Sequence, residues 1–582
     1  MENIREQLSR LVGDALSEAS GIADCNPNVI EATRPEFGDY QANGVMAAAG
    51  RCGRKPRELA EAVISGLRDE DGLVASTEVA GPGFINIRLN DQVLMVRGNE
   101  VLRDPQSLIP ADSRAQKIVV DQSSPNLAKE MHVGHLRGTV IGDCLSRVLE
   151  RLGHEVIRQN HVGDWGTQFG MLIAYMRELD REFNKSASLL QTELEDLETF
   201  YRAAKDKFDS DPAFADRARL SVVKLQGGDP EYLEAWQSFI DESLRHCQEI
   251  YRRLDVGLTL ADLDAESRYN DDLEGIIREL DEKGLLQESD GARCVFLPEF
   301  KGKDGEPLPV IVQKSDGGYL YSTTDLAAVK MRSFDFEADR SLYVVDARQS
   351  LHFRQVFAVA QAADMASANI SLEHIAYGTI MGSDGRPYKT RSGDSVKLAD
   401  LLDEAVARAL ELVSEKNPDL AEDKRRLIAE NIGIASVKYA DLSKNRMSDY
   451  VFDWSTMLSF EGNTAPYLLY ACTRIKSLLR KRPQESPTEE LTSLEHAEER
   501  ALLLKILQLP EVVSLVAKEC YPNLLCNYLF ELAGVFMRFY EACPVLKAEP
   551  QTRDSRLALA SLAEQALEQG LDLLGIQTLE RM

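Results

Sequence analysis

The sequence lacks the features that mark several special classes of protein. Its 9 cysteines are scattered along 582 residues, and no two of them form a CxxC pair. Neither a disulfide framework nor a cysteine-type zinc site is therefore indicated. No run of about 18 apolar residues, the length that crosses a bilayer, occurs in the chain. The first residues lack the apolar core of a signal peptide, so we expect a cytoplasmic protein that enters no membrane.

Positive charge is scarce relative to negative charge. The chain carries 67 Lys and Arg against 95 Asp and Glu, a net charge of −28. This balance argues against a protein that coats nucleic acid non-specifically, although a local basic patch can still contact one. Because the length exceeds what one hydrophobic core supports, we expect roughly three or four domains.

The chain is organised around one stretch, residues 117–143, and the pattern that follows it. An apolar run that ends in Asp121 predicts a strand, and a polar loop leads from it to HVGH (residues 132–135). Apolar residues at helical spacing then predict a helix, and residues 155–159 predict a second strand. In such a βαβ unit ligands bind at the carboxyl ends of the strands. The free N–H groups at the helix start favour a phosphate there.

The rest of the chain falls into an α+β part before this unit and an all-helical part after it. A piece of the first part, GPGFIN at residues 81–86, imitates half of a dinucleotide fingerprint, but a strand pattern follows it rather than a helix. We predict four regions in all: an α+β domain (1–112), an α/β catalytic domain (113–400) with a helical insertion at about 171–262, a helical connection (401–455) and a helical domain (456–582).

The two histidines of HVGH suit phosphate chemistry. Their imidazoles can donate hydrogen bonds to phosphate oxygens and change charge near neutral pH, and such donors stabilise the charge that develops at a transferring α-phosphate. Gly134 permits close approach of a nucleotide to the backbone. Alone, the motif could equally be a pair of surface histidines. A metal site is a further alternative, but no third ligand stands at a suggestive spacing, so we assign no metal ligand.

Several segments together resemble one family. SSPNLAKEMHVGHLRGTVIGD followed by NHVGDWGTQFG is similar to class I aminoacyl-tRNA synthetases, specifically to arginyl-tRNA synthetases of bacterial type. FGDYQ near residue 40, NTAPYLLYACTRI (463–475) and the ending LDLLGIQTLERM resemble the family's N-terminal domain, anticodon-binding domain and C-terminus. The resemblance implies a multidomain α/β protein: a Rossmann-type class I catalytic domain, an α+β N-terminal domain and an all-α C-terminal anticodon-binding domain.

The resemblance also implies a reaction. Members of the family activate L-arginine with ATP to arginyl-adenylate and transfer the arginine to the terminal ribose of arginine tRNA, and their activation step needs bound tRNA. Mg²⁺ is expected to arrive with ATP, as an ion that bridges phosphates usually does. We therefore expect arginine tRNA, L-arginine and ATP as partners of a monomeric enzyme.

The arginine pocket is carried over by resemblance. A guanidinium is planar and always charged, so carboxylates and amide oxygens in fork geometry suit it. Lysine lacks the fork and would leave buried acceptors unpaired, so binding alone can reject it. Without the family, Asp121 would pass for a strand-end turn residue and Asp325 for a charge at a helix N-terminus. The predicted arginine-binding residues are Asp121, Ser123, Asn126, Tyr321, Asp325 and Gln349.

The catalytic residues follow from two signatures, of which one is degenerate. HVGH matches the family's HIGH motif, so His132, Gly134 and His135 are expected to bind ATP and the two histidines to act in catalysis. The second signature, KMSKS, is missing, and the corresponding loop reads GRPYKTRSG. Lys389 in that loop and Lys129 just upstream of HVGH are candidates for offsetting the charge of the leaving pyrophosphate. Lys389 could equally be a solvated loop residue.

Contacts with tRNA are expected in two places. An N-terminal motif matches the part of the family that contacts the D-loop. The segment 471–482 carries five basic residues and no acidic one, and such residues position RNA through its phosphates; the alternative is a solvated helix face. Two nearby tyrosines can stack on splayed bases or pack in a core. The predicted tRNA-binding residues are Phe37, Tyr40, Gln41, Tyr467, Tyr470, Arg474 and Arg480.

Three other functions agree with parts of the sequence. A cysteinyl-tRNA synthetase shares the fold but needs cysteine zinc ligands, for which no spacing exists here. A paralogue without catalysis should show damage in HVGH or the arginine pocket, and none is visible. A nucleotidyltransferase uses HxGH chemistry but needs no helical C-terminal domain.

Overall fold

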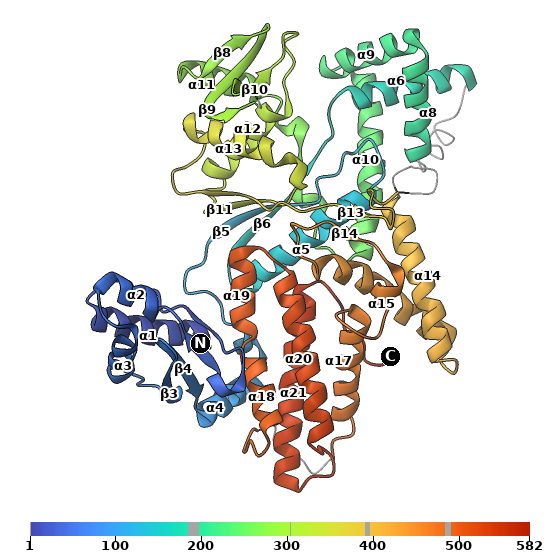
Figure 1. The fold of residues 1–582 in the computed structure, drawn as a ribbon. Helices are drawn as coiled ribbons and strands as arrows, with labels where there is room; N and C mark the ends of the chain where they lie inside the picture. The colour runs from blue at the N-terminus through green and yellow to red at the C-terminus, as the bar shows by residue number, and fades with distance from the viewer. Residues whose placement is uncertain (1, 184–196, 303, 390–395, 484–489) are drawn as a thin grey trace. The chain divides into compact units, whose positions relative to one another are not determined.

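The computed structural model describes residues 2–183, 197–302, 304–389, 396–483 and 490–582, and Figure 1 labels its elements. The chain divides into two compact units. Unit 1 comprises residues 1–112, 459–573 and 577–582, and unit 2 comprises residues 113–458 and 574–576. The GRPYKTRSG loop is described only as far as Lys389, because residues 390–395 lie outside the described ranges.

The N-terminal part of unit 1 is an antiparallel sheet with helices, as the sequence predicts. Four strands lie in the order β1-β2-β4-β3, and residues 81–83 form the turn between the last two in sequence rather than the start of a helix. Helix α1 (Ile4–Ser20) buries an apolar face, because Leu8, Val12 and Leu16 recur at helical spacing. The other elements are β1 (Val29–Glu31), β2 (Tyr40–Ala42), α2 (Val45–Cys52), α3 (Pro56–Gly66), β3 (Val74–Ala80), β4 (Phe84–Leu89) and α4 (Asp91–Arg103).

The C-terminal part of unit 1 is all helical, which confirms the prediction from the sequence. Its helices are long and amphipathic, and their buried faces carry mainly leucine, alanine and phenylalanine. They are α17 (Ala465–Leu479), α18 (Ala497–Leu507), α19 (Leu509–Glu519), α20 (Asn523–Ala542) and α21 (Pro550–Leu573).

Unit 2 is built on a five-stranded sheet in the order β12-β11-β5-β6-β7, in which every pair is parallel. The predicted βαβ unit is confirmed as β5 (Lys117–Asp121), α5 (Leu136–Arg151) and β6 (Glu155–Val162). Asp121 stands opposite Tyr343, so β5 and β11 end level, and opposite Gln159 on the other side, from which β6 continues to Val162 and pairs with β7. The remaining strands are β7 (Leu263–Ala265), β11 (Arg340–Tyr343) and β12 (Ser371–His374).

A group of helices lies between β6 and β7 in the sequence. It begins with α6 (Thr167–Phe183) and continues with α8 (Leu197–Ser210), α9 (Pro212–Gln226) and α10 (Pro230–Arg253). Aspartate caps start α9 and α10 at Asp211 and Asp229, each followed by a proline at the first helical position. Figure 1 shows α6, α8, α9 and α10 gathered as one group of helices.

Between β7 and β11 the chain forms a second, three-stranded sheet. The antiparallel strands β8 (Leu286–Ser289), β9 (Ala292–Lys301) and β10 (Pro307–Gln313) share an apolar core with three helices. These are α11 (Leu273–Glu282), α12 (Tyr321–Phe334) and α13 (Ser350–Ala362). Val312, Leu326 and Val356 lie at the centre of that core.

The last part of unit 2 is mostly helical. It contains α14 (Leu398–Lys416) and α15 (Glu422–Leu442), and a short parallel pair joins β13 (Ile380–Met381) to β14 (Tyr450–Val451).

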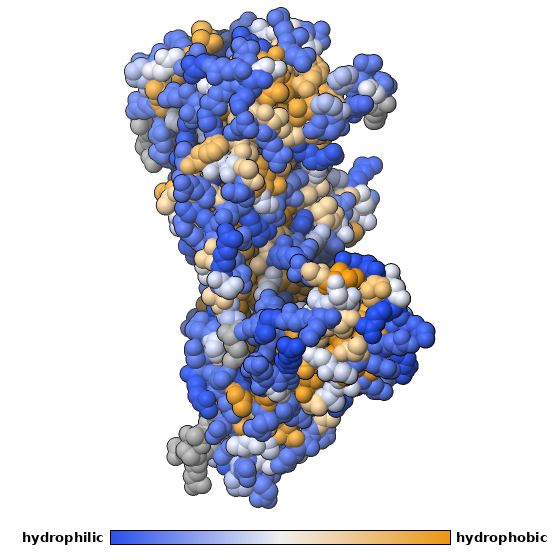
Figure 2. All heavy atoms as spheres, turned by 90° about the vertical axis from the view of Figure 1, so that its left-hand side faces the viewer, coloured by the Kyte–Doolittle hydropathy of each residue, from blue (hydrophilic) through white to orange (hydrophobic). Residues whose placement is uncertain are grey.

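Figure 2 shows hydrophilic side chains over most of the visible face, with hydrophobic ones in smaller areas. Within the described ranges, no helix is both long and apolar enough to cross a membrane.

Candidate active site

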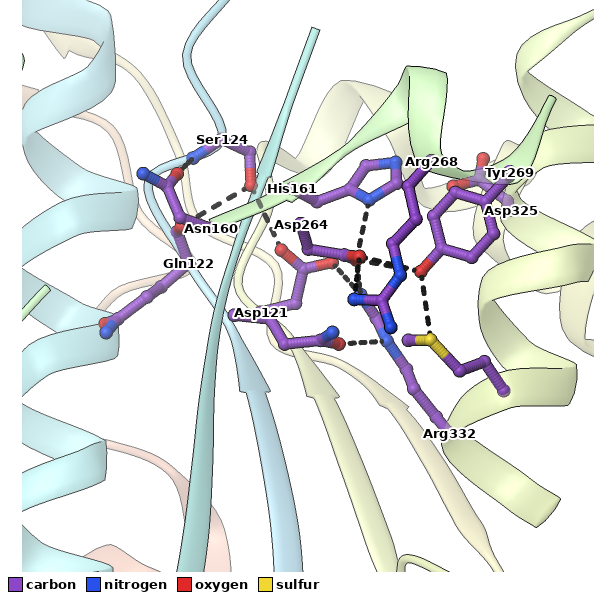
Figure 3. Close-up of polar contacts among 12 residues, drawn as sticks. Asp121, Gln122, Ser124, Asn160, His161, Asp264, Arg268, Tyr269, Asp325 and Arg332 are labelled. Atoms are coloured by element: carbon purple, nitrogen blue, oxygen red, sulfur yellow. Dashed lines mark hydrogen bonds and ion pairs between the residues drawn. The ribbon is translucent and has the colours of Figure 1, made fainter. Parts of the chain in front are cut away.

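The chain leaves β5 through a turn of unusual backbone conformation. Ser123 and Ser124 have φ angles of 70° and 48°, in the left-handed region, which costs an L-residue roughly 1–2 kcal/mol. The backbone N–H of Ser124 donates to Asn160 Oδ1 (3.0 Å), and its hydroxyl donates to Asp121 Oδ1 (3.0 Å). Figure 3 shows both contacts, which tie the turn to the ends of β5 and β6.

HVGH forms a reciprocal cap at the entrance to α5. The Gly134 N–H donates to His132 Nδ1 (3.0 Å), and the His132 N–H donates to His135 Nδ1 (3.1 Å). The two imidazole rings lie with their centroids 4.0 Å apart. Because each Nδ1 accepts a backbone N–H, a neutral ring carries its proton on Nε2. The motif therefore offers two Nε2–H donors beside the first turn of α5.

Both imidazoles are held in the neutral form. Burial and the nearby Lys129 ammonium lower the pKa of His132, and burial together with His132 lowers the pKa of His135 to about 3. The prediction that their charge changes near neutral pH is therefore wrong for His135, which stays a neutral donor. The sequence could not reveal this, because burial of His135 depends on the fold around it.

Gly134 is required for a second reason besides the one predicted. A Cβ atom at this position would lie 2.7 Å from Cε1 of His132. The glycine thus lets the His132 ring fold back over the turn, and it is itself exposed. Any other residue would displace the ring that completes the cap.

The two candidate lysines differ in how the structure holds them. Lys129 is half-buried beside the HVGH turn, and its Nζ lies 4.2 Å from the ring centroid of Tyr201 on α8. Lys389 is exposed at the edge of the stretch that the structure does not describe. After that stretch the chain returns to HVGH, where the Val133 N–H donates to the carbonyl of Val396 (3.0 Å).

An internal arginine lies at the ends of β5, β6 and β7. Arg332 on α12 is fully buried and donates from Nη2 to Asp121 Oδ2 (2.9 Å) and from Nε to Gln159 Oε1 (2.7 Å). The same Nη2 lies 3.6 Å from Asp264 Oδ2. Figure 3 shows the guanidinium beside Asp121 and Asp264. Asp121, predicted to bind a substrate arginine, thus already has an arginine partner from the same chain.

A second cation of this cluster is His161, at the end of β6. Its Nδ1 lies 3.1 Å from Asp264 Oδ2. Burial lowers the pKa of His161, but the bond to Asp264 and the charges of Asp121 and Asp325 outweigh it and raise the pKa to about 9. His161 is therefore an imidazolium at neutral pH. Arg268 is a third cationic neighbour, with Nη1 3.6 Å from Asp264 Oδ1. Arg332, His161 and Arg268 thus supply the positive charge beside Asp121 and Asp264.

Two further carboxyl groups stand beside the cluster of Asp121, Asp264, Arg332 and His161. Burial raises the pKa of Glu266 to about 7, and the charges of His161, Asp164 and Asp325 act on it. Asp325 pairs through Oδ2 with Nε2 of His352 at 2.6 Å. Asp325 lies in the second turn of α12 rather than the first, which argues against a role as a helix N-terminal charge. Glu266 was missed from the sequence, since no motif surrounds it.

The other predicted arginine-binding residues lie at different depths. Ser123 is buried, and its Oγ lies 2.8 Å from the hydroxyl of Tyr251 on α10. Asn126 is half-buried, and its Oδ1 accepts the N–H of Ala128 (3.0 Å). Tyr321 is 65% exposed at the start of α12. Gln349 is exposed in the turn η6 (Ala347–Gln349), three residues before the His352 that pairs with Asp325.

In unit 1 the structure corrects one predicted tRNA contact. Tyr40 is fully buried, and its hydroxyl donates to Glu511 Oε1 at 2.5 Å, so its side chain cannot reach a nucleic acid in this conformation. Phe37 is half-buried, and Gln41 donates from Nε2 to Asn86 (2.8 Å). The alternation of β2 turns Tyr40 inward, and the sequence alone did not reveal that side.

The basic segment on α17 is partly neutralised by the end of the chain. Lys476 pairs with Glu580 (2.8 Å), and Arg480 lies 3.5 Å from the same carboxylate. Arg474 lies 4.7 Å from the ring centroid of Tyr540. The two predicted stacking residues differ: Tyr467 packs against Phe530, with ring centroids 5.4 Å apart, whereas Tyr470 is 43% exposed.

No group of three or more His, Cys, Asp and Glu side chains in the described part of the chain is arranged to hold a metal ion. The acidic groups near the site instead have partners within the protein: Arg332 and His161 beside Asp121 and Asp264, and the His352 ring beside Asp325. A divalent ion that enters with a nucleotide would be held by its phosphates.

Three family models match the chain. The model described as tRNA synthetases class I (R), catalytic domain, matches residues 99–454. The DALR anticodon binding domain matches residues 468–582, and the arginyl tRNA synthetase N terminal domain matches residues 6–89. Together the three models account for most of the sequence.

Known proteins of similar sequence and structure carry related names. An arginine–tRNA ligase of Laribacter hongkongensis is 54% identical over 99% of this chain and 100% of its own. One of Hahella chejuensis is 54% identical over the whole of both chains. The crystal structure of arginyl-tRNA synthetase from Plasmodium falciparum superposes with a TM-score of 0.85 at 27% identity, and that of Thermus thermophilus with 0.81 at 25%, each over the full length of both chains.

Proposed function

The chain belongs to the arginyl-tRNA synthetase family, and we propose that it forms arginyl-adenylate at the carboxyl ends of β5 and β6. As a member of this family it is a ligase that uses ATP to join L-arginine to the 3′ end of arginine tRNA. One observation supports this position of the site above the others. Two carboxyl groups, Asp325 and Glu266, stand beside a cluster whose own acids, Asp121 and Asp264, are already paired with cations of the chain.

Asp325 and Glu266 receive the substrate guanidinium in this proposal. Asp121, which we predicted to bind arginine, is neutralised by Arg332 and shapes the floor of the pocket through Ser124. A planar guanidinium needs two acceptors in its own plane. Both oxygens of Asp121 already accept a hydrogen bond within the protein, whereas the contact of Asp325 with His352 uses Oδ2. Tyr321, Asn126, Ser123 and Gln349 remain proposed arginine contacts around the two acids.

ATP binds over the start of α5. The Nε2–H groups of His132 and His135 donate to phosphate oxygens, because both Nδ1 atoms are occupied by backbone donors. Gly134 stays exposed beside them. Donors that are already in position stabilise charge on the α-phosphate without reorganisation during the reaction. Lys129 and Lys389 offset the charge of the leaving pyrophosphate, and Mg²⁺ accompanies the nucleotide.

The tRNA-binding part of the proposal concerns exposed side chains. Phe37, Gln41, Tyr467, Tyr470, Arg474 and Arg480 remain proposed contacts, and Tyr40 acts only by holding β2 through its contact with Glu511. The domain division at 1–112, 113–400, 401–455 and 456–582 stays a proposal. So do a monomeric state and a cytoplasmic location.

The experiment that tests this function is an exchange and charging assay with purified protein. Arginine-dependent exchange between ATP and pyrophosphate should appear when arginine tRNA is added, and arginine should become esterified to that tRNA. Lysine should fail in both assays, because it cannot pair with both acids in fork geometry. Exchange with cysteine in place of arginine would contradict the assignment.

A further inference from the structure

Helix α10 closes the insertion, and one of its faces is directed at the loops that form the site. Trp236, Ser243 and Tyr251 are seven and eight residues apart, which places them on one side of the helix at 3.6 residues per turn. Ser243 and Tyr251 are each only 1% exposed. A polar group buried this deeply requires a hydrogen-bond partner, and each of the three has one in a loop at the end of β5 or β6.

The three contacts reach three separate points of the site. Trp236 donates from Nε1 to the carbonyl of Asp164 (2.7 Å), in the glycine-rich loop after β6. Ser243 donates from Oγ to the carbonyl of Leu127, next to Asn126. The hydroxyl of Tyr251 lies 2.8 Å from Ser123 Oγ, and it accepts from Nδ2 of Asn160 at 3.0 Å. Helix α10 thus holds the segment between β5 and HVGH at two points, Ser123 and Leu127.

The Tyr251 hydroxyl also heads a chain of hydrogen bonds that ends at HVGH. Ser123 Oγ lies 2.9 Å from Thr139 Oγ1, and Thr139 donates to the carbonyl of His135 (2.8 Å). Each hydroxyl has a single proton, and a carbonyl only accepts. Thr139 Oγ1 is within donating distance of both Ser123 Oγ and the His135 carbonyl, so its one proton serves one of them at a time. The hydroxyls of Tyr251, Ser123 and Thr139 are all buried, and their consecutive contacts lead from Asn160 to the carbonyl of His135.

The turn that this chain supports cannot hold its conformation by itself. Ser123 and Ser124 are two consecutive non-glycine residues with positive φ, and such strain persists only where the surroundings over-determine it. Without the Tyr251 hydroxyl, Ser123 loses one of its two partners and Asn160 loses the acceptor for Nδ2. Since Asn160 also accepts the N–H of Ser124, both serines would be released together.

We propose that α10 of the helical insertion positions the arginine pocket, with Tyr251 and Ser243 as its positioning residues. Neither residue touches a substrate; each acts through the backbone between Ser123 and Leu127. The insertion is therefore part of the machinery that sets the affinity for arginine. The inference rests on the proposed function only for the identity of the ligand that fills the pocket.

The test is to replace each residue by the side chain that lacks only the hydroxyl group. Tyr251→Phe and Ser243→Ala should each raise the KM for arginine about tenfold, the effect of ~1.4 kcal/mol. The KM for ATP should stay within about twofold, since the bond from Thr139 to the His135 carbonyl does not need Tyr251. General loosening of the fold would raise both constants in parallel, so the split between them reports positioning.

Matched controls come from the same helix. Tyr232→Phe alters a tyrosine that packs against Arg177 and Lys224, and Ser238→Ala alters a serine whose hydroxyl bonds within α10, to Glu234. Both should leave the two constants unchanged. If Tyr251→Phe does not fold, Ser243→Ala still tests the proposal.

Two results would overturn the positioning role. One is an arginine KM within about twofold of the unchanged protein in the variants that fold; the other is an equal rise of the arginine and ATP constants. Absence of arginine-dependent exchange in the unchanged protein would instead refute the proposed function. The two failures are therefore distinguishable in a single set of assays.

Discussion

Replacing Arg332 by methionine tests whether one internal guanidinium holds the acids at the strand ends. The side chain is fully buried and pairs with Asp121 at 2.9 Å and with Asp264 at 3.6 Å. Methionine occupies much of its volume but leaves both carboxylates buried without their shared cation. Removing one partner of a buried ion pair lowers the free energy of unfolding by about 3–5 kcal/mol. At ~1.4 kcal/mol per tenfold, amides of β5 and β11 should exchange with solvent on the order of 100- to several-thousand-fold faster.

The stability that Arg332→Met loses should depend on pH, and the direction of this dependence follows from the carboxyl groups that Arg332 contacts. Burial raises the pKa of Asp264, but the His161 hydrogen bond and the Arg332 charge outweigh it and hold the pKa below its usual value. A depressed carboxyl pKa stabilises the fold above the unfolded pKa, and this stability is lost as the pH falls through the folded pKa. Without Arg332 the carboxyl pKa rises, so protonation relieves the uncompensated charge. The loss of stability in Arg332→Met should therefore be smaller at about pH 5 than at about pH 7.5.

Native-state hydrogen exchange is the suitable assay, because it reports the opening of individual elements in a chain of two units. Lys330→Met on the same helix is the matched control. Its ion pair with Glu279 is at the surface, where such pairs contribute at most about 1 kcal/mol. The reasoning is refuted if Arg332→Met lowers the free energy of opening no more than Lys330→Met does, or if the loss is the same at both pH values.

Three further predictions concern the substrate pocket. Asp325→Asn should raise the arginine KM about 10- to 150-fold through loss of a charge-assisted hydrogen bond, at ~1.5–3 kcal/mol, and an equal rise for ATP would mean that the pocket is misplaced. Glu266 has a pKa of about 7, and a bound guanidinium favours its carboxylate, so arginine affinity should rise from about pH 6 to about pH 8 with release of a proton. Calorimetry in buffers of different ionisation enthalpy measures this release, which Glu266→Gln should abolish. Gly134→Ala places a Cβ 2.7 Å from the His132 ring, so it should slow exchange at least tenfold (about 1.4 kcal/mol) without altering the thermal midpoint; a normal rate would contradict the cap as described.

Local spacing in the sequence was sufficient for the βαβ unit and its phosphate-binding end. The apolar run before Asp121, the helical periodicity after HVGH and the next strand lie close together in the chain, and each pattern depends only on its own residues. The structure confirms β5, α5 and β6, with HVGH at the helix entrance. The α+β and all-helical parts of unit 1 were predicted for the same reason.

The sequence could not show which charged side chains of the pocket pair with one another. Arg332 lies 211 residues from Asp121 in sequence, on a helix whose spacing shows a buried face but not what that face meets. Glu266 stands in a short turn without a motif, and its raised pKa is a consequence of burial. A sequence match assigned Asp121 to the substrate, whereas the structure gives this carboxylate a partner from α12.

The sequence by itself determined which elements form and which residue types are available at the strand ends, because hydrophobic periodicity and turn chemistry are local. Only the tertiary structure decided that Tyr40 points into a core, that His135 stays neutral, and that Tyr251 of the insertion supports the turn at Ser123. These properties depend on desolvation and on partners far along the chain. Burial and charge pairing belong to the packed molecule, so they arise only when distant segments meet.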